Sequence, residues 1–300
     1  MSDLSAWILS VEGTETGRQA ALILALVAAV AHASLGAMQK GRFDPWLSRG
    51  AIDLWVGALS LPLAIFVVPF PGNDLLVLFP GMMVIHLAYK WVLAMAYTRG
   101  AFTAVYPVVR GTGPLATVLF AGLVFGEFFT PGQWTGVAIL CGGIFALAGF
   151  NLANEKIDPA TLRMALALAV LTGLITAVYT VYDAFAIRTA VDPLTFIVWF
   201  FLLEAVLFPA LLWNRWRVAG PALRPLFIRG FFGAFIAYIS FASIFLATRL
   251  DKVGEAAALR ETSVIFAALI GWLILGEKIG LIRAFLMVVI AAGAVLVEFG

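Results

Sequence analysis

The sequence predicts an all-α integral membrane protein with ten transmembrane helices, arranged as two inverted five-helix repeats. Three observations predict this class: a composition that is 63% hydrophobic and only 12% charged, a series of long apolar runs, and a sequence similarity between the two halves. A water-soluble domain of 300 residues cannot cover so much apolar surface, whereas a lipid bilayer can.

The apolar runs are long enough to cross a bilayer, which needs about 20 residues per helix. They are continuously apolar and lack the alternation that barrel strands show, so helices are favoured over a barrel. We place the ten spans, with soft boundaries, at about 20–40, 50–70, 76–98, 101–125, 132–151, 162–187, 194–213, 229–249, 252–275 and 279–299.

The remaining composition excludes several classes of protein. The first 19 residues carry a short apolar patch and no basic leader, so they do not resemble a cleaved signal peptide. Cys141 is the single cysteine, which excludes a disulfide within the chain, and two histidines with one cysteine cannot build a metal cluster. We therefore expect no metal and no other cofactor.

Three kinds of activity are also disfavoured. A net charge of +2 argues against a nucleic-acid partner. The chain contains no glycine-rich Walker loop, which argues against an ATP-driven pump. It also contains no cluster of nucleophile and base, and no paired acids with metal-ligand spacing, so we do not expect an enzyme.

The two halves of the chain share a motif. Residues 99–127 read RGAFTAVYPVVRGTGPLATVLFAGLVFGE, and residues 249–277 read RLDKVGEAAALRETSVIFAALIGWLILGE. Aligning these segments brings Arg110 onto Arg260 and superposes the closing Gly-Glu pairs. We therefore divide the chain into a first repeat, 1–157, and a second repeat, 158–300.

Each repeat holds five predicted spans. Because five is odd, two consecutive repeats lie in opposite orientations across the membrane. Inverted repeats are typical of secondary transporters, in which the substrate site lies near the bilayer midplane between the repeats.

The paired endings give a family resemblance. The segments LFAGLVFGEFFTPGQWTGVAILCGGIFAL and LIGWLILGEKIGLIRAFLMVVIAAGAVLV each join a Gly-Glu motif to a glycine-rich helix. Over nearly its whole length the chain resembles the EamA family of the drug/metabolite transporter superfamily. The resemblance implies carrier-type transport of small metabolites without a nucleotide motor, by a multi-pass protein of the bacterial inner membrane.

Two arginines lie inside predicted spans. A charged side chain at the bilayer centre costs about 2.5–3.5 kcal/mol on insertion scales, so Arg110 and Arg260 are expected to face the bundle interior. Two converging guanidinium groups suit a carboxylate, phosphate or phosphonate. The alternative is that each arginine pairs with an acid and only ties helices together, with Glu261, Glu204 or Asp183 as partner.

Other polar residues within the spans are candidates for the same site. Lys90 either adds a third positive group or pairs with Glu204, and it shares a helix face with His86 and Tyr97. Each remaining candidate either contacts substrate or joins helices by hydrogen bonds. The predicted substrate-binding set is Arg110, Arg260, Lys90, Glu261, Tyr106, His86, Asp183, Tyr179 and His32.

The fourth span contains several helix-disturbing residues around Arg110. Pro107 and Pro114, with nearby glycines, predict either a loosened helix that aims backbone groups at a substrate or a packing kink. The ninth span, 252–275, has no proline, so no break is expected there on this ground.

These observations lead to three functional hypotheses. The first is a secondary transporter of a small anionic or zwitterionic metabolite, and the alternative is an exporter of hydrophobic drugs or aromatic compounds. The third is a lipid-phosphate flippase, which needs a lateral opening to lipid. The expected partners are a small-molecule substrate and the bilayer, and the chain is expected to be a monomer or a homodimer.

The loop charges predict an orientation. Basic residues concentrate in the loops that follow the odd-numbered spans, and the positive-inside rule then places both termini outside the cytoplasm. The resemblance to characterised family members implies termini inside instead. The residues on the basic side are Lys40, Arg42, Arg49, Arg99, Lys156, Arg163, Arg215, Arg217, Arg224, Arg229, Lys278 and Arg283.

Overall fold

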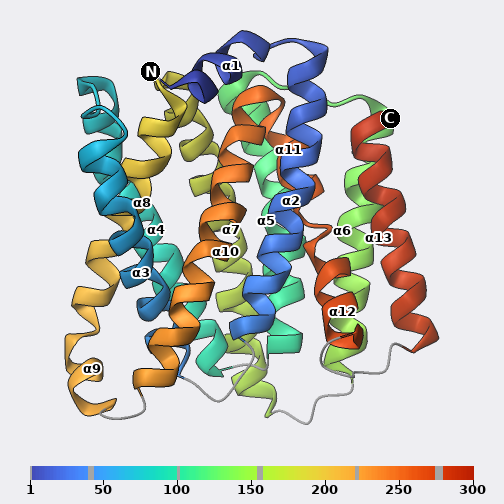
Figure 1. Cartoon of the computed structure of the whole chain (residues 1–300). Coiled ribbons are helices and arrows are strands. Elements are labelled where there is room, and N and C mark those ends of the chain that lie inside the picture. The colour runs from blue at the N-terminus through green and yellow to red at the C-terminus, as the bar shows by residue number, and fades with distance from the viewer. Residues whose placement is uncertain (1, 40–43, 100–101, 154–157, 220–222, 274–279) are drawn as a thin grey trace.

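A computed structural model describes residues 2–39, 44–99, 102–153, 158–219, 223–273 and 280–300. Within these ranges every regular element is a helix and no strand occurs (Figure 1). The helices are α1 (Asp3–Val11), α2 (Glu15–Gln39), α3 (Pro45–Phe66), α4 (Asn73–Arg99), α5 (Phe102–Phe125), α6 (Pro131–Leu152), α7 (Pro159–Thr189), α8 (Pro193–Leu211), α9 (Trp213–Ala219), α10 (Leu223–Leu250), α11 (Val253–Arg260), α12 (Ser263–Leu273) and α13 (Leu281–Phe299).

Among the described residues, nine helices are long and apolar enough to cross a membrane. The chain is therefore a multi-pass membrane protein, and each of these helices overlaps a predicted span. The nine candidate spans are α2, α3, α4, α5, α6, α7, α8, α10 and α13.

The ninth predicted span is interrupted, contrary to our expectation. The segment 252–275 forms α11 and α12, two short helices separated at Glu261 and Thr262. The backbone tightens there, since Glu261 and Thr262 donate to carbonyls three residues earlier and Thr262 Oγ1 also donates to Leu259 O. Proline is therefore not needed for this break. The interruption places Arg260 and Glu261 at the facing ends of two half-helices.

The fourth predicted span is continuous, so the prediction of a broken helix around Arg110 is wrong. α5 runs through Pro107 and Pro114 without interruption. Its glycines serve close contacts: a Cβ at Gly111 would lie 3.0 Å from the ring of Phe145 on α6. On the other side, a Cβ at Gly173 of α7 would lie 2.7 Å from Thr112 Cβ. Small residues thus let α5 approach both neighbours.

An aspartate followed by proline begins three of the long helices. Asp44 accepts hydrogen bonds from the first-turn amides of α3, Asp158 does so for α7, and Asp192 for α8. The carboxylate satisfies amides that have no partner within the helix, while proline fits the first helical position. These caps fix where the chain re-enters the bundle.

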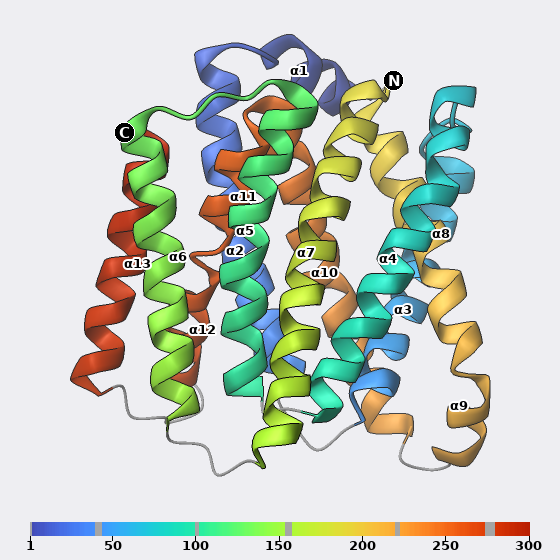
Figure 2. The same ribbon diagram turned by 180° about the vertical axis from the view of Figure 1, so that it is seen from behind.

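The long helices pack in pairs that mix the two halves of the chain. α2 packs on α10 and α4 packs on α7, while α3 packs on α8 and α6 on α13. At the last pair the backbones touch, because a Cβ at Gly293 would lie 2.4 Å from Leu140 N. Both termini lie at the same end of the bundle as α1 (Figures 1 and 2).

Candidate functional site

Two arginines from different halves of the chain meet at one carboxylate. Arg110 Nη1 on α5 donates to Glu261 Oε1 at 3.0 Å and to Glu261 Oε2 at 3.2 Å. Arg260 Nε lies 3.5 Å from the same Oε1. All three residues are buried, and we call Arg110, Arg260 and Glu261 the arginine cluster. The interruption between α11 and α12 brings Glu261 to this position.

Tyr106 lies beside the arginine cluster. Its ring centre is 5.2 Å from the guanidinium carbon of Arg110, a distance at which the ring face attracts a cation. Its hydroxyl is 3.4 Å from Ser263 Oγ at the start of α12. Arg110, Arg260, Glu261 and Tyr106 are thus brought together as one group.

Lys90 on α4 lies between two acids. Its Nζ is 2.9 Å from Asp53 Oδ2 on α3 and 2.9 Å from Glu204 Oε2 on α8, and it also donates to the Glu204 carbonyl at 3.1 Å. Arg49 Nε is 3.0 Å from the other oxygen of Asp53. Of the two roles predicted for Lys90, the pairing with Glu204 is present in the structure.

His86 extends this group of charges one helical turn before Lys90. Its Nε2 is 2.8 Å from Asp183 Oδ2 on α7, and its Nδ1 is 3.8 Å from Glu204 Oε2. The ring of Tyr179 lies 4.6 Å away, centre to centre. Together with the residues of the preceding paragraph these form what we call the acidic cluster: Arg49, Asp53, Lys90, His86, Asp183 and Glu204.

A small hollow, here called the central cavity, separates parts of the two clusters. Its volume is about 40 Å³, and it lies toward the end of the bundle where α2 and α4 end and α3 and α5 begin. Its polar and aromatic wall residues are His32, Arg49, Tyr89, Lys90, Tyr97, Tyr106, Arg110 and Phe241. No carboxylate belongs to this wall within the described part of the chain.

A second hollow, the inner cavity, lies next to the central cavity. Its volume is about 20 Å³, and Arg49, Lys90 and Phe241 belong to the walls of both. The inner cavity also contacts acids of the acidic cluster, including Asp53 and Glu204. Arg49 and Lys90 thus line both cavities, while their partners Asp53 and Glu204 line the inner cavity alone.

His32 is the predicted residue that lies apart from both clusters. It belongs to the wall of the central cavity, and its Nδ1 is 3.4 Å from Ser240 Oγ on α10. Arg260 and Glu261, in contrast, are not among the described wall residues of the central cavity. The cavity therefore reaches the arginine cluster through Arg110.

Sequence reasoning missed Asp53 and Arg49, as well as the aromatic wall residues Tyr89 and Phe241. Arg49 is near the start of α3, so we counted it with the loop charges, yet its side chain is only 19% exposed and lies in the walls of both cavities. The available signal was the spacing of four between Arg49 and Asp53, since such residues adjoin on a helix.

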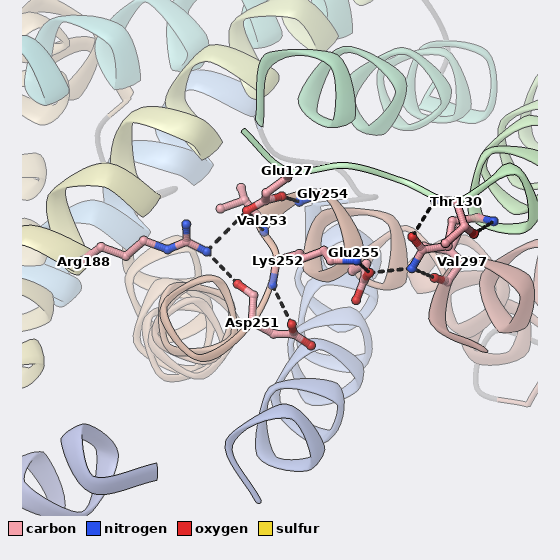
Figure 3. A network of polar contacts seen from close by, with 10 residues as sticks. Glu127, Thr130, Arg188, Asp251, Lys252, Val253, Gly254, Glu255 and Val297 are labelled. Atoms are coloured by element: carbon pink, nitrogen blue, oxygen red, sulfur yellow. Dashed lines mark hydrogen bonds and ion pairs between the residues drawn. The ribbon is translucent and has the colours of Figure 1, made fainter. Parts of the chain in front are cut away.

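At the opposite end of the bundle, polar contacts surround the start of α11. Figure 3 shows Glu127, from the Gly-Glu motif of the first half, at the start of this helix. Its carboxylate accepts from Val253 N at 2.8 Å and from Gly254 N at 3.1 Å, which satisfies amides at the positive end of the helix dipole. Gly126 provides the turn into this position, with a φ of 66° that favours glycine. The matching Glu277 lies outside the described residues.

Arg188 joins three elements at the same end (Figure 3). It donates to Asp251 O at 2.7 Å and to Thr248 O at 2.9 Å, and it lies 3.4 Å from Glu127 Oε1. Beside it, Lys252 Nζ is 2.7 Å from Glu255 Oε1. These contacts connect α7 with the end of α10 and the start of α11.

Comparison with solved structures supports the fold. One crystal structure aligns with a TM-score of 0.75 at 18% sequence identity, covering 93% of this chain and 97% of the other. At this identity the likeness shows the fold alone. Among curated proteins, no match to the chain was found.

Comparison with protein families locates the transporter signature in the second half. Residues 163–299 match the EamA-like transporter family. These residues run from α7 to the end of α13 and include Arg260, Glu261, Asp183 and Glu204. The family is one of transporters and not of enzymes. This part of the chain is therefore similar to the EamA-like transporter family.

Proposed function

We propose that the protein is a secondary transporter of a small anionic or zwitterionic metabolite, which binds at the central cavity. The observation that carries this proposal is the wall of that cavity: Arg49, Lys90 and Arg110 belong to it, and no described carboxylate does. A cavity lined by cations in a medium of low dielectric attracts an anion strongly. A zwitterion would in addition find Asp53 and Glu204 at the adjoining inner cavity.

Arg110 retains hydrogen-bonding capacity for such an anion. Glu261 occupies Nη1, whereas Nε is buried and has no hydrogen-bond partner among the described residues. A buried donor without a partner costs free energy, and a carboxylate, phosphate or phosphonate oxygen would satisfy it. The ion pair with Glu261 fixes the position of the Arg110 guanidinium and leaves its Nε able to donate to a substrate.

The volume of the central cavity indicates that binding requires movement. About 40 Å³ accommodates a few water molecules, whereas ligand pockets usually measure about 300–1,000 Å³. The closed arrangement is therefore compatible with an occluded carrier, in which helices separate to admit the substrate.

We infer further that residues 1–157 and 158–300 are two inverted repeats, related by a pseudo-two-fold axis. Such an axis would exchange the pair α2 and α10 with the pair α7 and α4. In both pairs the two helices pack against each other. α2 descends from the end that carries the termini and α7 rises toward it (Figure 2). α11 and α12, in sequence, would complete a tenth crossing as a broken helix, a feature of inverted-repeat transporters near their binding sites.

One feature of the cavity supports a second candidate function. Tyr89, Tyr97, Tyr106 and Phe241 provide an aromatic wall, which would suit an exporter of hydrophobic drugs or aromatic compounds. In that case the buried charges would serve only to hold helices together. The two functions differ in whether binding depends on the arginine cluster.

A thermal-shift screen of the purified protein distinguishes them, because a ligand that binds the folded state raises the unfolding temperature. Methylphosphonate and glutamate would represent anions, taurine a zwitterion, spermidine a cation and benzyl alcohol an uncharged aromatic compound. We expect stabilisation by the anions or the zwitterion. Stabilisation by the aromatic compound alone would favour the second candidate.

The matched variant for this screen is Arg110→Gln. Glu261 keeps Arg260 as its cation at 3.5 Å, so no buried charge loses its only partner and the variant should fold. We expect it to lose the ligand-induced shift. An unchanged shift in Arg110→Gln would contradict a binding role for Arg110.

A further inference from the structure

The two clusters carry opposite surplus charges. The arginine cluster has two guanidinium groups and one carboxylate, Glu261. The acidic cluster has three carboxylates but only two permanent cations, Arg49 and Lys90, so it carries one negative charge whenever His86 is neutral. Without substrate, the surplus of one cluster offsets that of the other.

The clusters are near enough to influence each other. Arg49 and Lys90 of the acidic cluster belong to the same cavity wall as Arg110 of the arginine cluster. The acids and most of the cations are buried, and an uncompensated charge in such surroundings costs several kcal/mol. An anion bound at the arginine cluster would cancel its positive surplus and leave the acidic cluster uncompensated.

His86 is placed to restore the balance. Both of its ring nitrogens face carboxylates, Nε2 toward Asp183 at 2.8 Å and Nδ1 toward Glu204 at 3.8 Å. A neutral imidazole with its proton on Nε2 donates to Asp183, while Nδ1 at 3.8 Å is too far from Glu204 for a hydrogen bond. A proton taken up at Nδ1 would place a second N–H group toward Glu204. The second oxygen of Asp183 is buried without a hydrogen-bond partner among the described residues.

We propose that His86 takes up one proton when an anion binds at the arginine cluster, so that the protein moves a proton together with its anion. This inference rests on the proposed function. The proton comes from solution by way of the central and inner cavities, since Lys90 lies in the walls of both and His86 contacts the inner one. A new N–H bond forms on the imidazole, which becomes an imidazolium between Asp183 and Glu204.

The charged and titratable groups around His86 come from every helix packed against α4. α7 contributes Asp183 and Tyr179, α8 contributes Glu204, and α4 itself contributes Lys90 and Tyr89. α3 acts through Asp53 and Arg49, and α5 contributes Arg110 on the far side of the central cavity. Within the described residues, His86 is the member of this set that titrates near neutral pH in ordinary surroundings.

The coupling has a defined sign. If His86 is neutral in the empty protein and protonated in the anion-bound protein, anion affinity rises tenfold for each unit by which the pH falls across that window. By the same linkage, any change that makes the arginine cluster more negative draws a proton to His86. A change that makes it more positive repels that proton.

Nuclear magnetic resonance of ¹⁵N-histidine tests this without any substrate. The chain has two histidines, so a His32→Gln background leaves His86 as the single labelled imidazole. Its ¹⁵N shifts, followed from pH 5 to 10 in nanodiscs, give the midpoint of its protonation. Arg260→Gln then removes one positive charge from the arginine cluster, as a bound anion would offset one. Glu261→Gln removes a negative charge, which makes the cluster more positive. Ser263→Ala is the matched control, because it changes the same region without changing charge.

We expect Arg260→Gln to move the His86 midpoint upward and Glu261→Gln to move it downward, each by on the order of one pH unit, while Ser263→Ala leaves it in place. Midpoints that agree across all variants, or shifts of the opposite sign, would overturn the proposal. If Arg260→Gln does not fold, Arg110→Gln is measured in its place, because it also removes one positive charge from the cluster. The midpoint of Glu261→Gln tests the proposal independently of both arginine variants. Since the measurement involves no anion, its failure would leave the anion-binding screen unaffected.

Discussion

Lys90 shows how a single residue organises the interior. Its ammonium group is held by the carboxylates of Asp53 and Glu204 and by a main-chain carbonyl, so it connects α4 with α3 and α8. All these groups are buried. A charge in such a place is stable only while its partners remain, because desolvation is costly and the pairing offsets it.

We therefore predict that Lys90→Met destabilises the protein by about 3–5 kcal/mol, since it leaves Glu204 without its lysine partner and Asp53 with Arg49 alone. Thermal unfolding in detergent measures the loss. The control is Lys90→Met combined with Glu204→Gln, which should recover part of the stability. A single variant as stable as the wild type would show that the pairs do not hold these helices together.

The residues of the site could be predicted from sequence only in part. Arg110, Arg260 and Lys90 were identified because a charge far from any helix end is rare in a membrane span. Arg49 and Asp53 escaped because they lie within the first turns of α3, where charges usually face the headgroups. Glu261 is one of the three acids that the sequence offers as partners of the buried arginines, but its contact with both arginines depends on the backbone turn between α11 and α12.

α11 is the element that connects the end of the bundle where the termini lie with the arginine cluster. Its first amides are capped by Glu127, and its last residue is Arg260. The Gly-Glu motif that gave the family resemblance therefore has a structural role in the first half, namely to hold the start of a half-helix from the other half. A break of the cap would loosen the helix that carries Arg260.

We predict that Glu127→Ala lowers the stability of α11 by about 0.5–2 kcal/mol, the usual cost of losing a helix cap. Hydrogen exchange of the Val253–Arg260 amides measures this directly. The control is Glu12→Ala, which removes a more exposed acid at the same end, and it should leave α11 exchange unchanged. Equal protection of α11 in Glu127→Ala and wild type would refute the capping role.

At the scale of elements, hydropathy predicted each of the nine candidate spans. The interruption of 252–275 is not predicted, because the segment contains no proline. Here hydrogen bonds within the chain produce the break, through backbone contacts three residues apart and the Thr262 hydroxyl. In α5 the opposite occurred: its prolines lie inside a continuous helix, and its glycines serve contacts with α6 and α7.

The whole molecule has two unlike ends. α1 and both termini share one end (Figure 1). At this end Arg188 of α7 contacts Glu127 and the carbonyl of Asp251. The other end carries α9 and the ends of α2 and α4, close to the central cavity. Arg215 and Arg217 of α9 are exposed there, on the side that the loop charges predict to face the cytoplasm.

We predict from this charge bias that the C-terminus lies outside the cytoplasm. Alkaline phosphatase fused after Gly300 should then be active, and green fluorescent protein fused at the same place should be dark. Fusions at Asp44 should give the reverse pattern and serve as the control. A fluorescent fusion at Gly300 would place the cavity end outside the cytoplasm instead.

The most direct test of the account is the uptake of radiolabelled substrate by proteoliposomes, because uptake is measured whether or not the transport carries net charge. Proteoliposomes with the wild-type protein should take up methylphosphonate, glutamate or taurine. The Arg110→Gln variant should take up none while unfolding at a similar temperature. Equal uptake by Arg110→Gln and the wild type would contradict the claim that the arginine cluster binds the transported anion.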